Sequence, residues 1–348
     1  MSGAEGPGGG GAPNVEGAQG AGGAPGAPGA PNVEGAQGAA ATPETAQDAP
    51  GRTPAVSVVI PTYRRAGSIT AAVRSVLRQT WTDFELIVVD DGSGDGTLEA
   101  LAAIDDPRLK VLEHETNRGA NAARNTGLRA ARADWVAFQD SDDEWLPEKL
   151  EAQLRRIGHG GPEAEAWIGV YCAMLQVDRR PDGRIETAWL PRPAARREPD
   201  LADELLRGNM ISTQVLLARR AKLIEAGLFD EDLGKMQDWD MALRFAPLGR
   251  IAYVDRPLAI QLLSEDSLTR MRDRRQRAYA QVLSRHAARF ARDPAALAEH
   301  RYRLALGAAG LGRRGEALGW AWRALAARPF EARWWVRIGR ALLRGGAS

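Results

Sequence analysis

An acidic cluster follows an apolar run in the middle of the chain, where residues 136–147 read VAFQDSDDEWLP. Asp140, Asp142 and Asp143 fall within one short turn after a segment typical of a β-strand. Carboxylates this close repel one another, so a bound cation would stabilise the cluster. Their oxygen atoms suit Mg²⁺ or Mn²⁺, which bind few protein carboxylates and leave positions open for substrate phosphates. A solvated acidic turn without a ligand is the alternative.

Two upstream segments have the pattern of a nucleotide-binding α/β domain. Residues 55–60 (AVSVVI) and 85–89 (ELIVV) predict buried parallel strands. The first strand is expected to break at residues 61–65 (PTYRR), after which Ser68 is the expected N-cap of an amphipathic helix. The second strand runs into residues 90–97 (DDGSGDGT), whose glycines allow a tight turn and whose acids can accept hydrogen bonds from a base or ribose. Ligands of open α/β sheets lie beyond the carboxyl ends of the strands, where these turns converge.

Five ordered motifs make residues 56–264 resemble the catalytic domain of glycosyltransferase family 2, which has the GT-A fold. The motifs are VSVVIPTY (56–63), VVDDGS (88–93), NRG followed by ARNTG (117–127), QDSDDEW (139–145) and QDWDMALR (237–244). Arg64 stands where the family frequently has Asn, and Gln237 stands where Glu often precedes the catalytic Asp. The expected fold is α/β, with a mixed, mostly parallel central sheet, a helical C-terminal region and a disordered N-terminal tail.

The resemblance implies a nucleotide-sugar site built from Pro61, Thr62, Tyr63, Arg65, Asp91, Arg124 and Asp140. Asp91 is expected to read the hydrogen-bonding edge of the base. The guanidinium fork of Arg124 suits bidentate pairing with oxygen acceptors of the base or diphosphate, whereas a surface cation is the alternative for this residue. Asp140 is expected to hold the ribose or to support a metal ion.

A sugar-nucleotide donor is a diphosphate ester, and its cleavage leaves additional negative charge on the nucleoside diphosphate. A divalent cation, Mg²⁺ or Mn²⁺, held by Asp142 with support from Asp140 would stabilise that leaving group. Asp143 is expected either to support the site from behind the residues that touch the ion or to bond to local backbone.

The family match assigns the general base to Asp238, at the expected start of a helix. There a carboxylate can accept a proton from an acceptor hydroxyl as its oxygen attacks the anomeric carbon. One direct displacement inverts the anomeric configuration. Asp240, two residues further on, is expected to have a structural role. Ser212 and Thr213, in a loop entering a strand, are expected on the acceptor side.

The ends of the chain differ from this domain. Residues 1–54 are rich in Gly, Ala and Pro, and GAPNVEGAQGA begins at both Gly11 and Gly29, which gives an 18-residue repeat and predicts a disordered tail without a signal peptide. No run approaches the roughly 20 apolar residues that span a bilayer. The single cysteine, Cys172, has an apolar setting that indicates a structural role. A cytoplasmic protein is expected, with residues 55–265 as the catalytic domain.

Residues 266–348 predict an Arg-rich helical region. From Arg270 onward there are 18 arginines, no lysine and five acidic residues, a net charge of +13. An apolar face recurs at spacings of three and four, at Tyr279, Val282, Leu283, His286 and Phe290. A pattern resembling one tetratricopeptide repeat follows, at Leu304, Gly312, Ala317, Ala321, Ala324 and Pro329. The charge predicts contact with an anionic membrane surface, aided by Trp320, Trp322, Trp334 and Trp335, unless these tryptophans pack between helices.

The function expected from these features is inverting transfer of one sugar from a nucleotide-diphosphate sugar, with UDP as the expected nucleotide. The acceptor would be a saccharide or lipid-linked saccharide in cell-surface polysaccharide or glycolipid synthesis, and no nucleic-acid partner is expected. The alternative is an inactive nucleotide-binding scaffold that recruits partners through helical repeats. A dinucleotide-binding oxidoreductase would need G-x-G-x-x-G after the first strand, where the chain has PTYRRAG. A processive synthase would carry membrane spans and a Q-x-x-R-W motif, and neither occurs.

Overall fold

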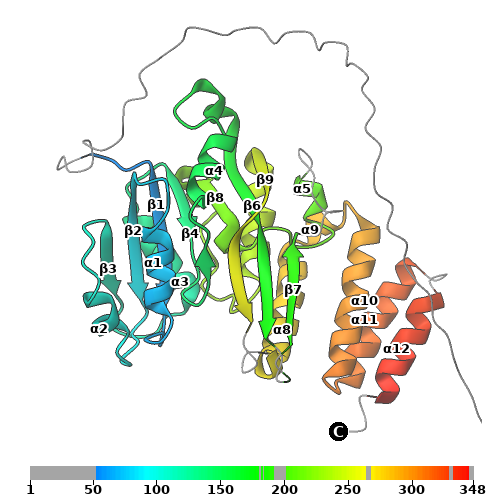
Figure 1. Cartoon of the computed structure of the whole chain (residues 1–348). Coiled ribbons are helices and arrows are strands. Elements are labelled where there is room, and N and C mark those ends of the chain that lie inside the picture. The colour runs from blue at the N-terminus through cyan, green and yellow to red at the C-terminus, as the bar shows by residue number, and fades with distance from the viewer. Residues whose placement is uncertain are drawn as a thin grey trace, which may run out of the picture. The chain divides into compact units, whose positions relative to one another are not determined.

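The computed structural model of the chain describes residues 52–179, 182, 184–191, 201–263, 268–328 and 332–344. Within this part, one mixed sheet has the strand order β3-β2-β1-β4-β8-β6-β9-β5, with β7 paired to β6 (Figure 1). Its strands are β1 Val56–Thr62, β2 Phe84–Asp90, β3 Leu109–Glu113, β4 Trp135–Phe138, β5 Glu144–Trp145, β6 Trp167–Arg179, β7 Ile185–Leu190, β8 Leu216–Arg219 and β9 Arg250–Leu263. Strands β3, β2, β1 and β4 run parallel to one another, and β8 is antiparallel to β4.

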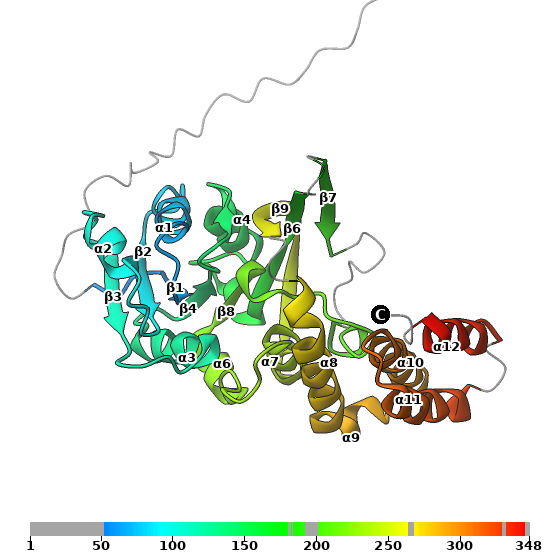
Figure 2. The same cartoon turned by 90° about the horizontal axis from the view of Figure 1, so that it is seen from below.

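Helices cover both faces of this sheet. Figure 2 shows α1 and α4 on one face and α3, α6 and α7 on the other. The helices are α1 Ile69–Leu77, α2 Thr97–Ala102, α3 Ala120–Ala130, α4 Lys149–Arg156, α5 Leu201–Glu204, α6 Arg220–Glu225, α7 Gln237–Phe245, α8 Leu268–Arg285, α9 Ala287–Phe290, α10 Pro294–Gly310, α11 Arg314–Ala327 and α12 Ala332–Arg344. Short 3₁₀ turns occupy Pro162–Ala166, Thr213–Val215 and Ala246–Leu248.

The central parallel strands are buried along their whole length, as their continuous apolar runs predicted. The predicted break at Pro61 was wrong, because β1 continues through Pro61 and Thr62, which pair in register with Val89 and Asp90 of β2. Pro61 has no N–H to donate to a neighbouring strand. The pairing of β1 with β2 nevertheless continues, because the carbonyl of Thr62 accepts a hydrogen bond from the amide of Asp91 at 2.8 Å. The two strands therefore end side by side.

Helices α8 and α9 share a hydrophobic core with the sheet domain. Val282, Leu283 and Phe290 are buried in the same cluster as the central strands. The sequence predicted one continuous apolar face here, whereas the structure ends α8 at Arg285 and begins α9 at Ala287, with His286 as the N-cap of α9. Cys172 is a free, fully buried thiol whose pKa is raised to about 11 by burial, which confirms its structural role.

Helices α10, α11 and α12 form a second cluster around Trp334, which is 2% exposed and stacks on Tyr302 with ring centroids 4.6 Å apart. Trp334 therefore packs between helices and does not face a membrane surface. No described helix is both long enough and apolar enough to cross a bilayer. The resemblance to a tetratricopeptide repeat stays a prediction. Residues 1–51 of the predicted tail, Pro329 and the side chain of Trp335 lie outside the described part of the chain.

Candidate active site

The loops that follow β1, β2 and β4 are tied together at the carboxyl edge of the sheet. The amide of Arg65 donates to Thr97 Oγ1 at 3.0 Å, which joins the loop after β1 to the first residue of α2, where the loop after β2 ends. Ser68 occupies the predicted N-cap position of α1 but makes no capping bond with its side chain. Its Oγ instead donates to the carbonyl of Ser141 at 3.0 Å, which joins the first loop to the acidic turn. The three loops therefore form one continuous edge.

The residues at the end of β1 present polar groups at this edge. Thr62 is 3% exposed, and its Oγ1 has no hydrogen-bond partner among the described residues. Tyr63 is 38% exposed, and the guanidinium of Arg64 lies 5.2 Å from the centre of its ring. Arg64 has φ of 52°, in the left-handed region that Asn tolerates better than most residues. An Asn at position 64 would therefore adopt this backbone conformation more readily than Arg64 does.

Asp91 is buried and held by the residues that lead into α3. Its Oδ2 accepts from the amide of Gly119 at 2.7 Å, and its Oδ1 accepts from the amide of Arg118 at 2.9 Å. Nδ1 of His114 lies 2.7 Å from the same Oδ1, a contact that the sequence analysis missed. A carboxylate oxygen has two lone pairs, so Oδ2 keeps one acceptor position for a ligand. The role of Asp91 in reading the base stays a prediction.

Arg124 pairs with Asp140 beneath the acidic turn. The Arg124 side chain is 5% exposed, so the alternative of a surface cation was wrong. Its Nη2 donates to Asp140 Oδ1 at 2.7 Å, and its Nη1 donates to Asn121 Oδ1 at 3.2 Å. Its Nε is buried without a hydrogen-bond partner among the described residues. The structure thus joins two of the predicted nucleotide-sugar residues in one charged pair.

The other two acids of the turn have different surroundings. Asp142 is half exposed and pairs with Arg65 at 3.1 Å. Burial and the negative charge of Asp140 raise the pKa of Asp142 above its usual value, and Arg65 offsets part of this rise. Asp143 is buried, and its Oδ1 accepts from the amide of Leu262 at 3.0 Å. Asp143 therefore bonds to the backbone of β9 rather than to local backbone, and burial with the charge of Asp140 raises its pKa to about 8.

The acidic turn has donor groups that fit Mg²⁺ or Mn²⁺. No group of three His, Cys, Asp or Glu side chains in the described ranges is arranged to hold a metal ion. Asp140 and Asp142 provide two carboxylates, and Mg²⁺ usually needs one or two of these together with water and substrate phosphate oxygens. Burial and the negative charge of Asp140 both act against ionised Asp142, and a bound cation would offset these two effects.

Asp238 lies in the first turn of α7, as predicted, and lines a cavity of about 500 Å³. Ser212 lines the same cavity, whereas Thr213 is 4% exposed and faces a smaller void toward the core. Burial and the charge of Asp140 raise the pKa of Asp238, while hydrogen bonds from the amide of Trp239 and the side chain of Asn209 act against this rise. Other residues of the cavity that the sequence analysis missed are Met174, Leu190, Arg207, Met210, Gln261 and Arg275.

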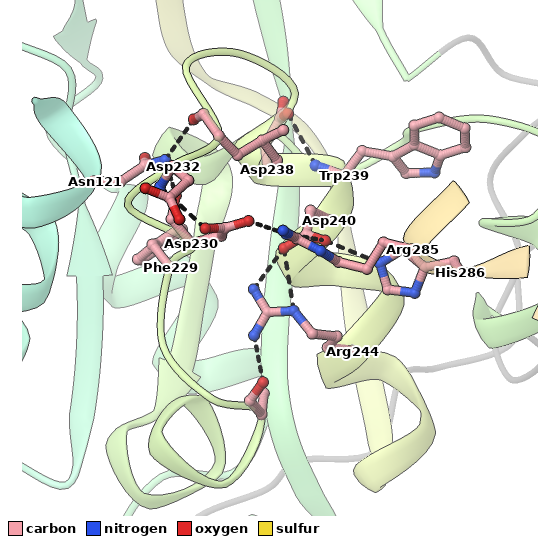
Figure 3. Close-up of polar contacts among 12 residues, drawn as sticks. Asn121, Phe229, Asp230, Asp232, Asp238, Trp239, Asp240, Arg244, Arg285 and His286 are labelled. Carbon is pink, nitrogen blue, oxygen red and sulfur yellow. Dashed lines mark hydrogen bonds and ion pairs between the residues drawn. The ribbon is translucent and has the colours of Figure 1, made fainter. Parts of the chain in front are cut away.

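Two asparagines of α3 hold the loop that leads to α7. Nδ2 of Asn121 donates to the carbonyls of Asp230 and Leu233 at 2.7 and 2.8 Å (Figure 3). Asn125 accepts from the amide of Phe229 at 2.9 Å and donates to its carbonyl at 2.8 Å. These side chains had no predicted role, although two amides spaced four residues apart on one helix face are a recognisable signal.

Asp240 is fully buried and has the structural role that was predicted for it. Arg244 donates to its Oδ2 from Nη2 at 2.6 Å and from Nε at 3.1 Å. His286 Nε2 lies 2.9 Å from its Oδ1 (Figure 3). Burial acts to raise the pKa of Asp240, but the bond to His286 and the charge of Arg244 prevail and lower the pKa to about 2.

Residues 57–221 match the family model described as glycosyl transferase family 2. One relative is the UDP-Glc:alpha-D-GlcNAc-diphosphoundecaprenol beta-1,3-glucosyltransferase WfgD of Escherichia coli. It is 43% identical over 99 residues, which are 28% of this chain and 39% of the relative. The chain spans 32% to 66% of the length of the first three curated relatives that it matches.

Two solved structures show the same fold. Staphylococcus aureus TarS 1-349, in complex with UDP-GlcNAc, has a TM-score of 0.59 at 22% identity and covers 82% of this chain and 89% of that one. The mannosyltransferase PcManGT from Pyrobaculum calidifontis, in complex with GDP-Man and Mn²⁺, has a TM-score of 0.55 at 20% identity and covers 87% and 88%. These likenesses confirm the predicted GT-A fold, and the family model matched by residues 57–221 is that of the family which the sequence resembles.

The low pKa of Asp240 predicts a specific loss of stability in acid. A carboxyl whose pKa falls from 3.8 to about 2 on folding stabilises the folded state above the unfolded value, and this contribution is lost as the pH falls through the folded value. The contribution amounts to about 2 kcal/mol. The difference in unfolding free energy between wild type and Asp240→Asn should therefore shrink by about this amount from about pH 6 to about pH 2. Urea denaturation at both pH values measures it.

The matched control is Asp232→Asn, which removes an exposed carboxylate from the loop before α7. Its difference from wild type should stay near zero throughout. A pH-independent difference for Asp240→Asn would contradict the assigned charge pairing.

Proposed function

We propose that this chain is a member of glycosyltransferase family 2, whose model residues 57–221 match, and that it transfers one sugar from a nucleotide-diphosphate donor to an acceptor hydroxyl with inversion. One observation carries the proposal. Burial is the main cause that raises the pKa of both Asp142 and Asp238, and the charge of Asp140 adds to the rise in each, so the candidate cation-binding turn and the candidate base share one charged neighbour. A diphosphate leaving group and an attacking hydroxyl need such groups on opposite sides of one anomeric carbon.

The donor would bind over the ends of β1 and β2. Thr62 Oγ1 and the remaining acceptor position of Asp91 would meet the base, with Tyr63 and Pro61 beside it. Asp140 and Asp142 would hold Mg²⁺ or Mn²⁺, which when bound offsets negative charge on the departing nucleoside diphosphate. Arg65 would exchange its half-exposed pair with Asp142 for phosphate oxygens.

We propose UDP as the nucleotide. The donor in the name of the Escherichia coli relative is UDP-Glc, and the Staphylococcus aureus structure contains UDP-GlcNAc. The GDP-Man complex of the archaeal mannosyltransferase makes GDP the competing choice, and also supports Mn²⁺ as the cation.

Asp238 would act as the general base on the acceptor side. Its raised pKa brings its basicity closer to neutral pH, where a general base works best. As the acceptor oxygen bonds to the anomeric carbon, its proton passes to the Asp238 carboxylate, and the bond to the diphosphate breaks. Because the nucleophile enters opposite the leaving group, the anomeric configuration inverts. Ser212 and Asn209, which share the cavity, would bind acceptor hydroxyls, with Thr213 behind them.

The acceptor that we propose is a lipid-linked saccharide of cell-envelope polysaccharide or glycolipid synthesis, used at the cytoplasmic side of the membrane. The name of the Escherichia coli relative gives a diphosphoundecaprenol-linked acceptor, which is of this class. The cavity at Asp238 combines apolar side chains, Met174, Leu190 and Met210, with polar groups, as a sugar with polar edges and apolar faces requires. An inactive scaffold, which is the alternative function, would not require the Asp238 carboxylate to line this cavity.

Turnover tests this function. Purified protein is incubated with a panel of nucleotide sugars and lipid-linked saccharides, with Mn²⁺ or with EDTA, and the product's anomeric configuration is read by NMR. Asp238→Asn keeps the side-chain shape but removes the proton acceptor. It should retain donor binding and lose about 10²–10⁴ in transfer rate. Asp142→Ala should abolish transfer that depends on Mn²⁺.

Undiminished transfer in EDTA would contradict the proposed metal dependence. A wild-type transfer rate in Asp238→Asn would show that another residue acts as the general base. Donor binding without any turnover would support the scaffold.

We further propose peripheral contact with an anionic membrane through α11. Leu318 and Trp322 lie one turn apart on this helix and are 56% and 71% exposed. Arg314 and Arg323 are exposed on the same helix. Tryptophan favours the membrane interface, and a basic residue near an anionic surface contributes about 1 kcal/mol. This surface would bring the enzyme to a lipid-linked acceptor.

Co-sedimentation with liposomes tests the membrane contact. Binding to vesicles rich in anionic lipid should exceed binding to neutral vesicles, weaken with salt and fall in Trp322→Ala. The matched control is Trp189→Ala on β7, which removes a tryptophan that is 42% exposed and should leave binding unchanged. Equal binding to neutral and anionic vesicles, or none to either, would leave α11 as a packing surface.

A further inference from the structure

We infer that helices α8, α9 and α10 position the catalytic base, because they hold the two residues that directly follow Asp238. The inference rests on the proposed role of Asp238. Successive residues of an α-helix point about 100° apart, so the side chains after Asp238 turn away from its direction. In Figure 3, Trp239 and Asp240 extend toward the side of α7 where His286 lies.

Trp239 is anchored in a cluster of rings from all three helices. It is 1% exposed, and its ring centroid lies 5.5 Å from that of Tyr279 on α8, 5.8 Å from that of Phe290 on α9 and 5.1 Å from that of His300 on α10. Its Nε1 donates to the carbonyl of Leu205 at 2.8 Å. The indole is therefore fixed both by packing and by a directional bond.

His300 fixes the arrangement of this cluster. It is fully buried, and burial lowers its pKa to about 4, so the ring stays neutral near physiological pH. Its Nε2 lies 2.6 Å from the carbonyl of Leu206, which can only accept, so Nε2 carries the hydrogen. Its Nδ1 then accepts from the hydroxyl of Tyr279, 2.6 Å away. One ring thus links α10, α8 and the segment after α5.

Asp240 and the loop before α7 are held by the last residue of α8, Arg285, and by the N-cap of α9, His286. His286 Nε2 lies 2.9 Å from Asp240 Oδ1, and Arg285 Nη1 lies 3.5 Å from the same oxygen. Arg285 also pairs with Asp230, so one guanidinium bridges the loop and the first turn of α7 (Figure 3). A fully buried carboxylate cannot exchange these partners for water, so their loss would displace the helix turn itself.

The donor-site carboxylates have direct partners outside α8, α9 and α10. Asp91 is held by residues 118 and 119, and Asp140 is held by Arg124 of α3. Loss of the α8 contacts should therefore move the base while leaving nucleotide binding intact. A displacement of 1 Å at a reacting group can reduce the rate by about 10²-fold.

The test compares His286→Ala, His286→Gln and the control Arg274→Ala, which changes an exposed residue of α8. At a temperature where all variants are folded, His286→Ala should reduce kcat by about 10- to 100-fold with an unchanged Kd for UDP. His286→Gln supplies an amide N–H toward Asp240 and should recover part of kcat. Arg274→Ala should match wild type in both quantities.

Hydrogen–deuterium exchange gives a readout that does not require turnover. In His286→Ala, amides of residues 236–245 should exchange faster, while those of β1 and α3 keep the wild-type rate. An unchanged kcat in folded His286→Ala overturns the inference, and so does an equal loss of kcat and UDP affinity. If the wild type transfers no sugar, the proposed function has failed, and with it the role of Asp238 as a base. The exchange pattern then decides only whether these helices hold the turn that carries Asp238: local acceleration supports that contact, and no change overturns it.

Discussion

The negative charge of Asp140 is the constraint around which this edge of the molecule is arranged. Burial is the larger cause, and the charge of Asp140 adds to it, in raising the pKa of Asp142, Asp143 and Asp238, which come from the turn after β4 and from the start of α7. Arg124, buried on α3, pairs with Asp140 and compensates part of that charge. Asp143 accepts a hydrogen bond from the backbone of β9. Asp142 is half exposed, and Asp238 lines a cavity. Of the three carboxylates with raised pKa, the two with access to a ligand are those to which we assign cation binding and base catalysis.

Helix α3 connects the parts of the site to the sheet. The residue before it, Gly119, donates to Asp91, and Arg124 within it donates to Asp140. Asn121 holds the loop that precedes α7. The helix packs so closely on β1 that a Cβ at Gly127 would overlap the side chain of Val59. A helix in such close contact with the central strand can fix three loops relative to one another.

The sequence predicted those features that depend on local patterns. Buried runs located the parallel strands, and the acids at strand ends located the turn that carries Asp140 and Asp142. The end of β1 was missed because it depends on register with β2. The partners of Asp91 and Asp240 were missed because His114 and His286 lie 23 and 46 residues away along the chain. A contact made across the fold leaves no periodic signal in the sequence, so motif resemblance could name residues but not their supports.

The proposal that Asp140 and Asp142 form a cation and diphosphate site is tested most directly by equilibrium binding of Mn²⁺. Electron paramagnetic resonance of free Mn²⁺, with and without UDP, measures both stoichiometry and affinity. The expected result is one ion per chain, bound more tightly when UDP is present, with this binding lost in Asp142→Ala and retained in the exposed control Asp232→Asn. Unchanged Mn²⁺ binding in Asp142→Ala, or no binding that depends on a nucleoside diphosphate, would contradict the proposal.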